Sequence, residues 1–315
     1  YAVAVAAGDA RYVMNKETGT IDTLYGPDML LLDPRKEVFV NRVLSDKESE
    51  LMYPGNQESL EHNRVLRGVE REVETGGALL EKQPIYAVSA STENYKSALM
   101  PQQMKRSTKF TKPHAVTLDD KYSGAPTLNV WTGSAVLLVK ADGERRIEVG
   151  PKVVVLDYDE TLASLHLSTG KPKTTDRILT TGYLQVENNK VSDIISVETS
   201  DGVEISLKLS YRVSFEGVWK YWFNIDNYVK FLCDHCRSRL KGVARRKNVR
   251  EFYASVVDIV RDTLLGAHKE NGPRDGLLFT ENGMRINEVE VLGIEIQDPE
   301  INVKLKEQQQ AVITN

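Results

Sequence analysis

The most regular pattern in the chain is VEISLKLSYRVSF, residues 203–215. Apolar residues occupy every second position from Val203 to Phe215, and Glu, Ser, Lys and Arg fill the positions between them. Because side chains alternate between the two faces of a strand, the pattern predicts a strand with one buried and one wet face, as in an antiparallel sheet. Ser200-Asp201-Gly202 predicts a hairpin turn that joins it to a strand at Val191 to Thr199.

The residues that follow predict helices and one further strand. Asp226 to Val243 and Val249 to Leu265 carry apolar residues at the three- and four-residue spacing of a helix face. Met284 to Ile296 then predicts the last strand. The order β-β-α-α-β indicates an α+β domain with helices on one face of an antiparallel sheet, which we place at residues 175–298.

The N-terminal pattern returns later in the chain at a constant offset of 124 residues. Val136 to Val139 repeats Tyr12 to Met14, Gly150-Pro151 repeats Gly26-Pro27, and Leu156-Asp157 repeats Leu32-Asp33. An ungapped match of strands, turn glycines and a Gly-Pro pair indicates two copies of one supersecondary unit. We place these small antiparallel β-sheets at residues 1–44 and 127–174.

Residues 45–126 separate the two copies and are rich in polar residues. Gln57 to Glu74 predicts an amphipathic or largely solvated helix, which Gly76-Gly77 ends. The basic residues of the following stretch are Lys105, Arg106, Lys109 and Lys112. They are more typical of a solvated loop than of a binding patch. We expect this segment to be an insertion or linker beside the sheets.

A catalytic interpretation competes for the second copy. GPKVVVLDYDETL, residues 150–162, places Asp157 and Asp159 after an apolar run, as haloacid-dehalogenase-type phosphatases place a nucleophile and a general acid. Such an enzyme needs a parallel sheet, whereas the downstream pattern predicts antiparallel hairpins. In the first copy Asp33 is followed by Pro34 and Arg35, so the second carboxylate is missing there. A carboxylate that ends a strand and caps a turn explains both copies, and we predict no catalytic residue.

Composition excludes several classes of function. The formal charge of -4, from 41 basic and 45 acidic residues, gives no footprint of a nucleic-acid binder. No window approaches the ~18 to 20 consecutive apolar residues that cross a bilayer. With two cysteines the chain has no disulfide framework, which predicts a reducing, cytoplasmic compartment.

The histidines and cysteines predict no metal or cofactor site. Cys233 and Cys236 stand in a C-D-H-C motif that is open to a redox pair or half a zinc site, but no second CxxC or HxxxH supplies the other ligands. We interpret them as small buried hydrophobic residues on a helix face. The histidines are scattered without triad or metal spacing: His62, His114, His166, His235 and His268.

The two ends of the sequence also lead to predictions. Tyr1 to Ala7 lacks the basic region of a secretory signal, and we expect the start to be a truncation or processing point. After Pro299, Glu300 to Asn315 reads as the first turns of a helix. We therefore predict that residues 299–315 begin a helix of a longer polypeptide.

Four blocks of sequence together resemble a known family. They are residues 150–173 (GPKVVVLDYDETLASLHLSTGKPK), 191–216 (VSDIISVETSDGVEISLKLSYRVSFE), 225–243 (IDNYVKFLCDHCRSRLKGV) and 279–300 (FTENGMRINEVEVLGIEIQDPE). In this order they resemble the major vault protein family, from its last β repeats through its shoulder domain to the start of its cap helix. The resemblance covers roughly Val3 to Leu44 and Leu128 to Asn315. The long segment 45–126 departs from the family pattern and points to a distant or prokaryotic relative.

The resemblance implies a structural role. In the family, Gly-Pro strand units stack along a barrel wall, and the shoulder resembles the band-7 domain of stomatins, prohibitins and flotillins. A self-assembling shell subunit is therefore implied, with other copies of itself as partners, possible cargo, no cofactor and no catalytic residue to transfer. A band-7-type membrane scaffold is the alternative, since residues 191–296 would fit either protein. We favour the shell because β repeats precede the domain where those scaffolds carry a membrane anchor.

Overall fold

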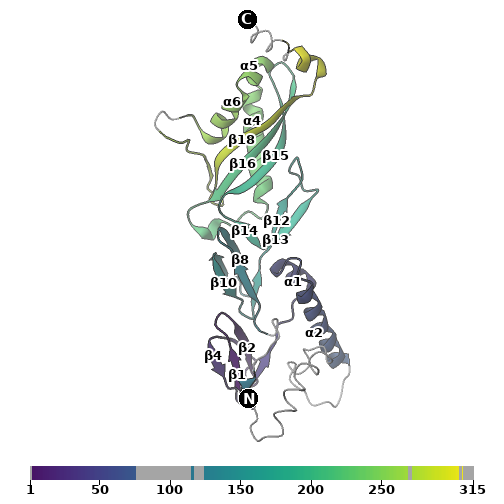
Figure 1. The fold of residues 1–315 in the computed structure, drawn as a ribbon, viewed down its shortest axis with the longest axis vertical. Helices are drawn as coiled ribbons and strands as arrows, with labels where there is room; N and C mark the ends of the chain where they lie inside the picture. The colour runs from purple at the N-terminus through teal and green to yellow at the C-terminus, as the bar shows by residue number, and fades with distance from the viewer. Residues whose placement is uncertain (1, 76–114, 117–123, 269–271, 305–306, 308–315) are drawn as a thin grey trace. The chain divides into compact units, whose positions relative to one another are not determined.

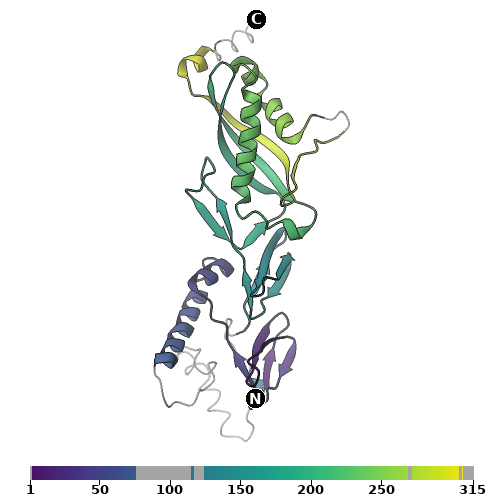
Figure 2. The ribbon, with the colours of Figure 1, turned by 180° about the vertical axis from the view of Figure 1, so that it is seen from behind.

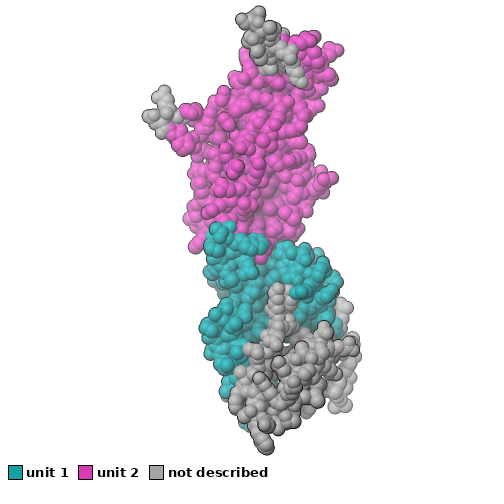
Figure 3. Space-filling view, in the orientation of Figure 1, with its two compact units in different colours: residues 1–132, 136–163 teal, residues 133–135, 164–315 magenta. Residues whose placement is uncertain are grey.

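The computed structural model describes residues 2–75, 115–116, 124–268, 272–304 and 307. The predicted loop with Lys105, Arg106, Lys109 and Lys112, and also His114, lies outside these residues. The chain divides into two compact units (Figure 3). Unit 1 comprises residues 1–132 and 136–163, and unit 2 comprises residues 133–135 and 164–315.

Unit 1 begins with the first copy of the repeat. Its strands are β1 (Ala2–Val5), β2 (Ala10–Asn15), β3 (Ile21–Tyr25), β4 (Asp28–Leu30) and β5 (Glu37–Val40). Strand β1 pairs antiparallel with β4, while β2 lies between β3 and β5, antiparallel to both. The short strand β6 (Ala115–Val116) pairs parallel to β1. Figure 1 shows β1, β2 and β4 together near the N-terminus.

The second copy has the same plan. Its strands are β7 (Thr127–Val130), β8 (Ser134–Lys140), β9 (Arg145–Val149), β10 (Lys152–Val155) and β11 (Glu160–Leu162). Strand β10 pairs antiparallel with β7, and β8 pairs with both β9 and β11. The register is conserved between the copies, since Met14 faces Val38 in the first and Leu138 faces Leu162 in the second. Both residues of the pair are thus shifted by the predicted 124 positions.

The first strand of each copy departs from this offset. Val5 faces Asp28 in the first copy, and Val130 faces Lys152 in the second, so the first strands are related by 125 residues and the fourth strands by 124. The reason lies in the turn after the first strand, where residues 6–9 are replaced by residues 131–133. Because this turn is one residue shorter in the second copy, only the first strand is shifted. The later strands keep the same register in both copies.

Helices α1 (Asp46–Met52) and α2 (Gln57–Thr75) follow the first copy. The predicted helix at 57–74 is thus present, whereas α1 was not predicted. Its start is fixed by a capping box, in which the Ser45 hydroxyl accepts from the Glu48 N–H and the Glu48 carboxylate accepts from the Ser45 N–H. The spacing Ser-x-x-Glu was the signal in the sequence that could have revealed this helix.

Unit 2 contains three short strands before its main domain: β12 (Leu165–Ser168), β13 (Ile178–Thr181) and β14 (Tyr183–Gln185). The main sheet has the order β15-β16-β18-β17, with every pair antiparallel. Its strands are β15 (Asn189–Glu198), β16 (Glu204–Phe215), β17 (Leu277–Phe279) and β18 (Met284–Ile296). Strands β12 and β13 pair antiparallel with each other.

Helices cover one face of the main sheet. They are α4 (Tyr228–Ala244), α5 (Val249–Ala254) and α6 (Val256–Leu265), preceded by the 3₁₀ turn η2 (Trp219–Tyr221). Figure 2 shows α4 in front of the sheet, and Figure 1 shows the opposite face of the sheet. The predicted continuous helix 249–265 is interrupted at Ser255, whose ψ of 25° leaves the helical range. The predicted α+β class, with small antiparallel sheets and a few helices, is confirmed.

The core of unit 2 follows the alternation that the sequence displayed. Alternate β16 residues Ile205, Leu207, Leu209, Tyr211 and Val213 are fully buried against the helices. From α4 the core receives Leu232, Cys233, Cys236 and Leu240, and both cysteines are free thiols. Burial raises the pKa of the Cys236 thiol to about 12, so this side chain packs as a neutral, apolar group at physiological pH. No helix of the described residues is long and apolar enough to span a membrane.

Candidate functional site at the Asp157 turn

The turn between β10 and β11 is built by backbone hydrogen bonds and one carboxylate. The Glu160 N–H donates to the Asp157 carbonyl at 3.1 Å, and the Asp157 N–H donates to Oε2 of Glu160 at 3.0 Å. The first copy closes its turn in the same way, with the Lys36 N–H donating to the Asp33 carbonyl and the Asp33 N–H donating to Oε2 of Glu37. In both copies a glutamate therefore caps the N–H of the aspartate.

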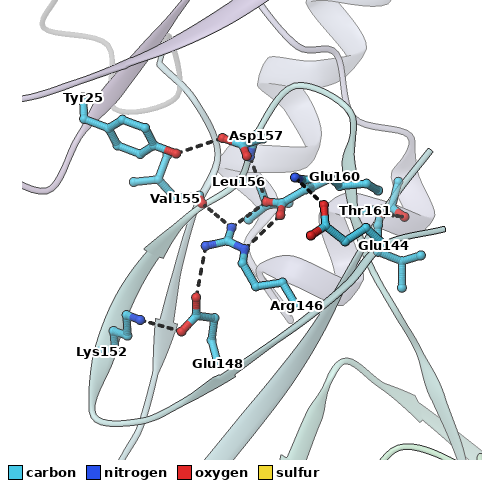
Figure 4. A network of polar contacts seen from close by, with 12 residues as sticks. Tyr25, Glu144, Arg146, Glu148, Lys152, Val155, Leu156, Asp157, Glu160 and Thr161 are labelled. Carbon is cyan, nitrogen blue, oxygen red and sulfur yellow. Dashed lines mark hydrogen bonds and ion pairs between the residues drawn. The ribbon is translucent and has the colours of Figure 1, made fainter. Parts of the chain in front are cut away.

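The buried carboxylate of Glu160 is balanced by Arg146 from β9. Arg146 Nε lies 2.8 Å from Oε1 and Nη2 lies 2.5 Å from Oε2 of Glu160, a bidentate pair (Figure 4). The same Nη2 donates to the Val155 carbonyl at 3.1 Å, and Nη1 contacts Glu148, which in turn pairs with Lys152. Only 1 % of the Glu160 side chain is exposed, so without Arg146 it would be an unpaired buried charge.

Three side chains of the first copy bind the turn of the second. The Tyr12 hydroxyl donates to the Leu156 carbonyl at 2.7 Å. The Tyr25 hydroxyl donates to Oδ1 of Asp157 at 2.8 Å, as Figure 4 shows. Arg42 donates to the carbonyls of both Asp157 and Glu160. The Tyr12 ring also meets the Tyr158 ring edge to face, with centroids 5.2 Å apart. The turn thus joins the two copies of the repeat.

The electrostatics of the two phenols fit this joining role. Burial raises the pKa of the Tyr12 phenol well above its usual value of 10, with Arg42 opposing the shift. Burial, and then the hydrogen bond to Asp157, raise the pKa of Tyr25 to about 12. Both hydroxyls therefore remain protonated at neutral pH and act as donors.

The geometry differs from that of a nucleophile site. Asp157 directs an oxygen to the Tyr25 hydroxyl, while Asp159 is exposed to solvent. The strands that flank the turn are antiparallel to their partners, so the parallel sheet of a haloacid-dehalogenase-type enzyme is not formed here. Among the described residues no group of three or more His, Cys, Asp or Glu side chains is placed to hold a metal ion.

One detail corrects the interpretation of the aspartates. A single role, capping of the turn, was expected for both Asp33 and Asp157. Asp33 does cap its own turn, because its Oδ1 accepts from the Arg35 N–H at 3.0 Å. The Asp157 carboxylate instead binds Tyr25 of the other copy, since that phenol reaches it across the contact.

Comparison with known proteins shows what the main domain of unit 2 is similar to. Residues 187–298 match the family model of the major vault protein that is described as the shoulder domain. Over these residues the chain is similar to the major vault protein family. The match begins just before β15 and ends just after β18, so it spans the main sheet of unit 2 together with α4, α5 and α6.

Individual relatives agree with the family model. The chain is 27% identical over 175 residues to the major vault protein of Strongylocentrotus purpuratus and to major vault protein alpha of Dictyostelium discoideum. It is 28% identical over 160 residues to the major vault protein of Diplobatis ommata. The alignments cover 53%, 53% and 49% of this chain and 20%, 20% and 19% of the relatives, so the chain spans about a fifth of their length.

The shoulder domain holds a buried ion pair that sequence reasoning missed. Asp193 on β15 has a fully buried side chain and lies 2.7 Å from Nη2 of Arg237 on α4. Its other oxygen accepts from the Lys173 N–H at 2.8 Å. The sequence offered one signal: Asp193 occupies a position of β15 that faces the core. Arg237 lies on the helix that packs against this strand. The pair links α4 to β15, because the fully buried Asp193 carboxylate would be costly to leave unpaired.

Among the residues that the structure describes, the histidines form no cluster that could hold a metal ion. His166 lies 2.9 Å from an oxygen of Asp226, and both side chains are about half exposed. On α4, His235 accepts from Nε of Arg239 and its ring packs on Phe279. Tyr12, Tyr25, Arg42, Arg146 and Glu160, which build the Asp157 turn, were not singled out from the sequence. Their partners lie up to 144 residues away, so no local spacing marks them.

Proposed function

We propose that the chain is a structural subunit that assembles with copies of itself into a large, hollow, vault-type shell and performs no catalysis. The observation that carries the proposal is the shoulder-domain match at residues 187–298 in a chain whose relatives are named major vault proteins. The same proposal places the particle in the cytoplasm and assigns its interior to cargo. Two Gly-Pro strand units precede the shoulder, as a barrel wall built from stacked repeats requires.

A physical argument supports assembly. The strands of each repeat lie in small sheets of two to four strands, which are marginal in water until their faces and edges are covered. The contact through Tyr12, Tyr25 and Arg42 covers one end of each copy, as stacking does in repeat proteins. Neighbouring chains would cover the remaining edges.

Negative-stain electron microscopy of the full-length protein tests the proposal. We expect closed, hollow particles in the fractions that elute first from a size-exclusion column. Recovery of the protein only as small soluble species would contradict a shell. If the protein instead pelleted with liposomes and formed no closed particle, the band-7-type membrane scaffold would replace it.

The absence of catalysis is tested at Asp157, the carboxylate that the sequence motif suggests as a nucleophile. We expect no Asp157-dependent hydrolysis of p-nitrophenyl phosphate in the presence of Mg²⁺, because Asp157 is bound to Tyr25 in an antiparallel setting. The measurement compares the purified wild type with Asp157→Asn, and Asp159→Asn serves as the exposed control. Turnover that disappears only with Asp157→Asn would establish an enzyme.

A further inference from the structure

The shoulder domain contains two blocks of opposite charge. Residues 237–250, RSRLKGVARRKNVR, include seven basic and no acidic residues. Residues 286–300, INEVEVLGIEIQDPE, include five acidic and no basic residues. The chain as a whole has nearly balanced charge, with 41 basic and 45 acidic residues. Charge is therefore segregated within this one domain.

The two blocks lie on different layers of the domain. We call Arg239, Lys241, Arg245 and Arg246 the basic strip, and all four are exposed at the C-terminal end of α4 or directly after it. The helix, which lies in front of the sheet in Figure 2, buries its apolar side with Leu232, Cys233, Cys236 and Leu240. The basic strip is therefore on the exposed side of the helix layer.

The acidic strip lies on the open face of the sheet. We define it as Glu288, Glu290 and Glu295 of β18. Glu288 faces Arg212 of β16, which is exposed, while Glu290 and Glu295 face the buried serines Ser210 and Ser206 on the same side of the sheet. Helices cover only the other face, as the two ribbon views show. The sheet therefore separates the acidic strip from the basic strip of the same chain.

Local ion pairs leave both strips available. Arg245 reaches Glu198 only at 3.9 Å, with both side chains more than half exposed. Glu288 and Glu295 pair with Arg212 and Lys208, again between exposed groups. Exposed pairs of this kind contribute about 0–1 kcal/mol each, so exchange for new partners costs little. Leu292, at 59 % exposed, lies among the acidic residues and offers an apolar contact.

We propose that the basic strip of one copy binds the acidic strip of the next copy, so that the helix layer of each shoulder domain overlaps the open sheet face of its neighbour. The inference rests on the proposed self-assembly and names the surfaces that carry it. A contact between two different surfaces repeats from chain to chain and closes into a ring when the rotation allows. A second copy is favoured over a nucleic acid as partner because the same domain carries the matching negative surface, which would repel a polyanion.

Charge reversal tests the proposal in the full-length protein. Lys241→Glu with Arg246→Glu reverses the basic strip, and Glu288→Lys with Glu290→Lys reverses the acidic strip. Arg35→Glu with Lys36→Glu, at exposed positions of unit 1, makes the same change of charge elsewhere. Sedimentation velocity measures self-association, and circular dichroism confirms that each variant is folded.

We expect each strip reversal to lower the associated fraction at least tenfold at 0.1 M NaCl, and the control pair to leave it unchanged. Combining both reversals restores the attraction with exchanged signs, so association should recover to at least half of the wild-type level. Wild-type association should also weaken between 0.05 and 0.5 M NaCl, as expected for exposed charges.

Three outcomes would overturn the inference: unchanged association of the single reversals, no recovery in the combined variant, or loss of binding to single-stranded RNA by the basic-strip variant with association intact. The last outcome would identify a polyanion site. Failure of the proposed function is seen separately, because sedimentation reports the pairwise contact even if microscopy shows no closed shell.

Discussion

At the scale of single residues, the Asp157 turn shows how a catalytic-looking motif can serve as a joint. Its two aspartates have different surroundings, since Asp157 binds Tyr25 while Asp159 is exposed. The buried acid of the motif is Glu160, which is neutralised by Arg146 and caps the Asp157 N–H. Tyr12 closes the contact from the other copy with a buried hydrogen bond. The acidic residues Asp157 and Glu160 of this motif therefore stabilise a turn and its contact with the first copy.

Removing the Tyr12 hydroxyl should weaken this joint. In Tyr12→Phe the Leu156 carbonyl loses its 2.7 Å donor in a buried position, and we expect the free energy of unfolding to fall by about 1–3 kcal/mol. Urea denaturation followed by circular dichroism measures the change. Tyr25→Phe is the matched control and should cost less, because Tyr25 is 53% exposed and water can replace its hydrogen bond. Equal losses in the two variants would contradict the assignment.

Tyr25 also predicts a dependence on pH. Its pKa is raised from 10.0 to about 12, by burial first and then by the bond to Asp157, so the folded state favours the neutral phenol. The resulting stability is fully present below pH 10 and is lost as the pH rises toward 12. We expect Tyr25→Phe to lose less stability than the wild type between pH 10 and 12, as measured by urea denaturation at each pH. Parallel curves would rule out this linkage.

At the scale of elements, the repeat is defined by its strand register and by close backbone contacts. A Cβ added at Gly26 would lie 2.0 Å from the Ala6 carbonyl oxygen, and one at Gly150 would lie 2.1 Å from the Trp131 carbonyl oxygen. The two glycines are 124 residues apart and play the same part, because only glycine lets the chain pass this close to the preceding turn. This steric requirement for glycine explains why a Gly-Pro pair marks the same position in both copies of the repeat.

Gly26→Ala and Gly150→Ala should therefore be about equally harmful. Each forces a backbone oxygen to move, and we expect each to lower the free energy of unfolding by about 2–3 kcal/mol. Thermal denaturation and hydrogen exchange of the affected copy measure the loss. Gly68→Ala in α2 is the control, since its Cβ would meet nothing within 4 Å and alanine favours a helix. An unaffected Gly26→Ala would refute the equivalence of the copies.

At the scale of the whole molecule, the chain combines a repeat unit with a domain that matches the shoulder-domain model of the major vault protein. The shoulder domain has its own core between the main sheet and α4 and α6. Residues 299–304 are helical and follow this core after Asp298, whose carboxylate accepts from the N–H groups of Glu300 and Ile301. The domain is therefore complete before this helix begins.

Cutting the chain after Gln297 should separate folding from assembly. We expect the shoulder domain to keep its circular dichroism spectrum, because the core residues named above all precede the cut. The particle yield in negative-stain micrographs should fall, since helices of neighbouring chains can pack only when residue 298 and its successors are present. A cut after Asn315 in a longer form of the protein is the control. An unchanged yield after truncation at Gln297 would show that the helix does not drive assembly.

The sequence by itself determined the local elements, because their signals lie within one turn or one strand. Alternation predicted β16 and β18, helical spacing predicted α2 and α4, and the 124-residue echo predicted the paired sheets. Only the tertiary structure decided what Asp157 binds, since Tyr25 lies 132 residues away and no spacing rule links them. The same holds for the ion pair of Asp193 and Arg237 and for the opposite layers of the two charged strips. The periodicity of a sequence indicates which face of a helix or strand is apolar. Which side chains pair with one another depends on packing between elements that are distant in the chain.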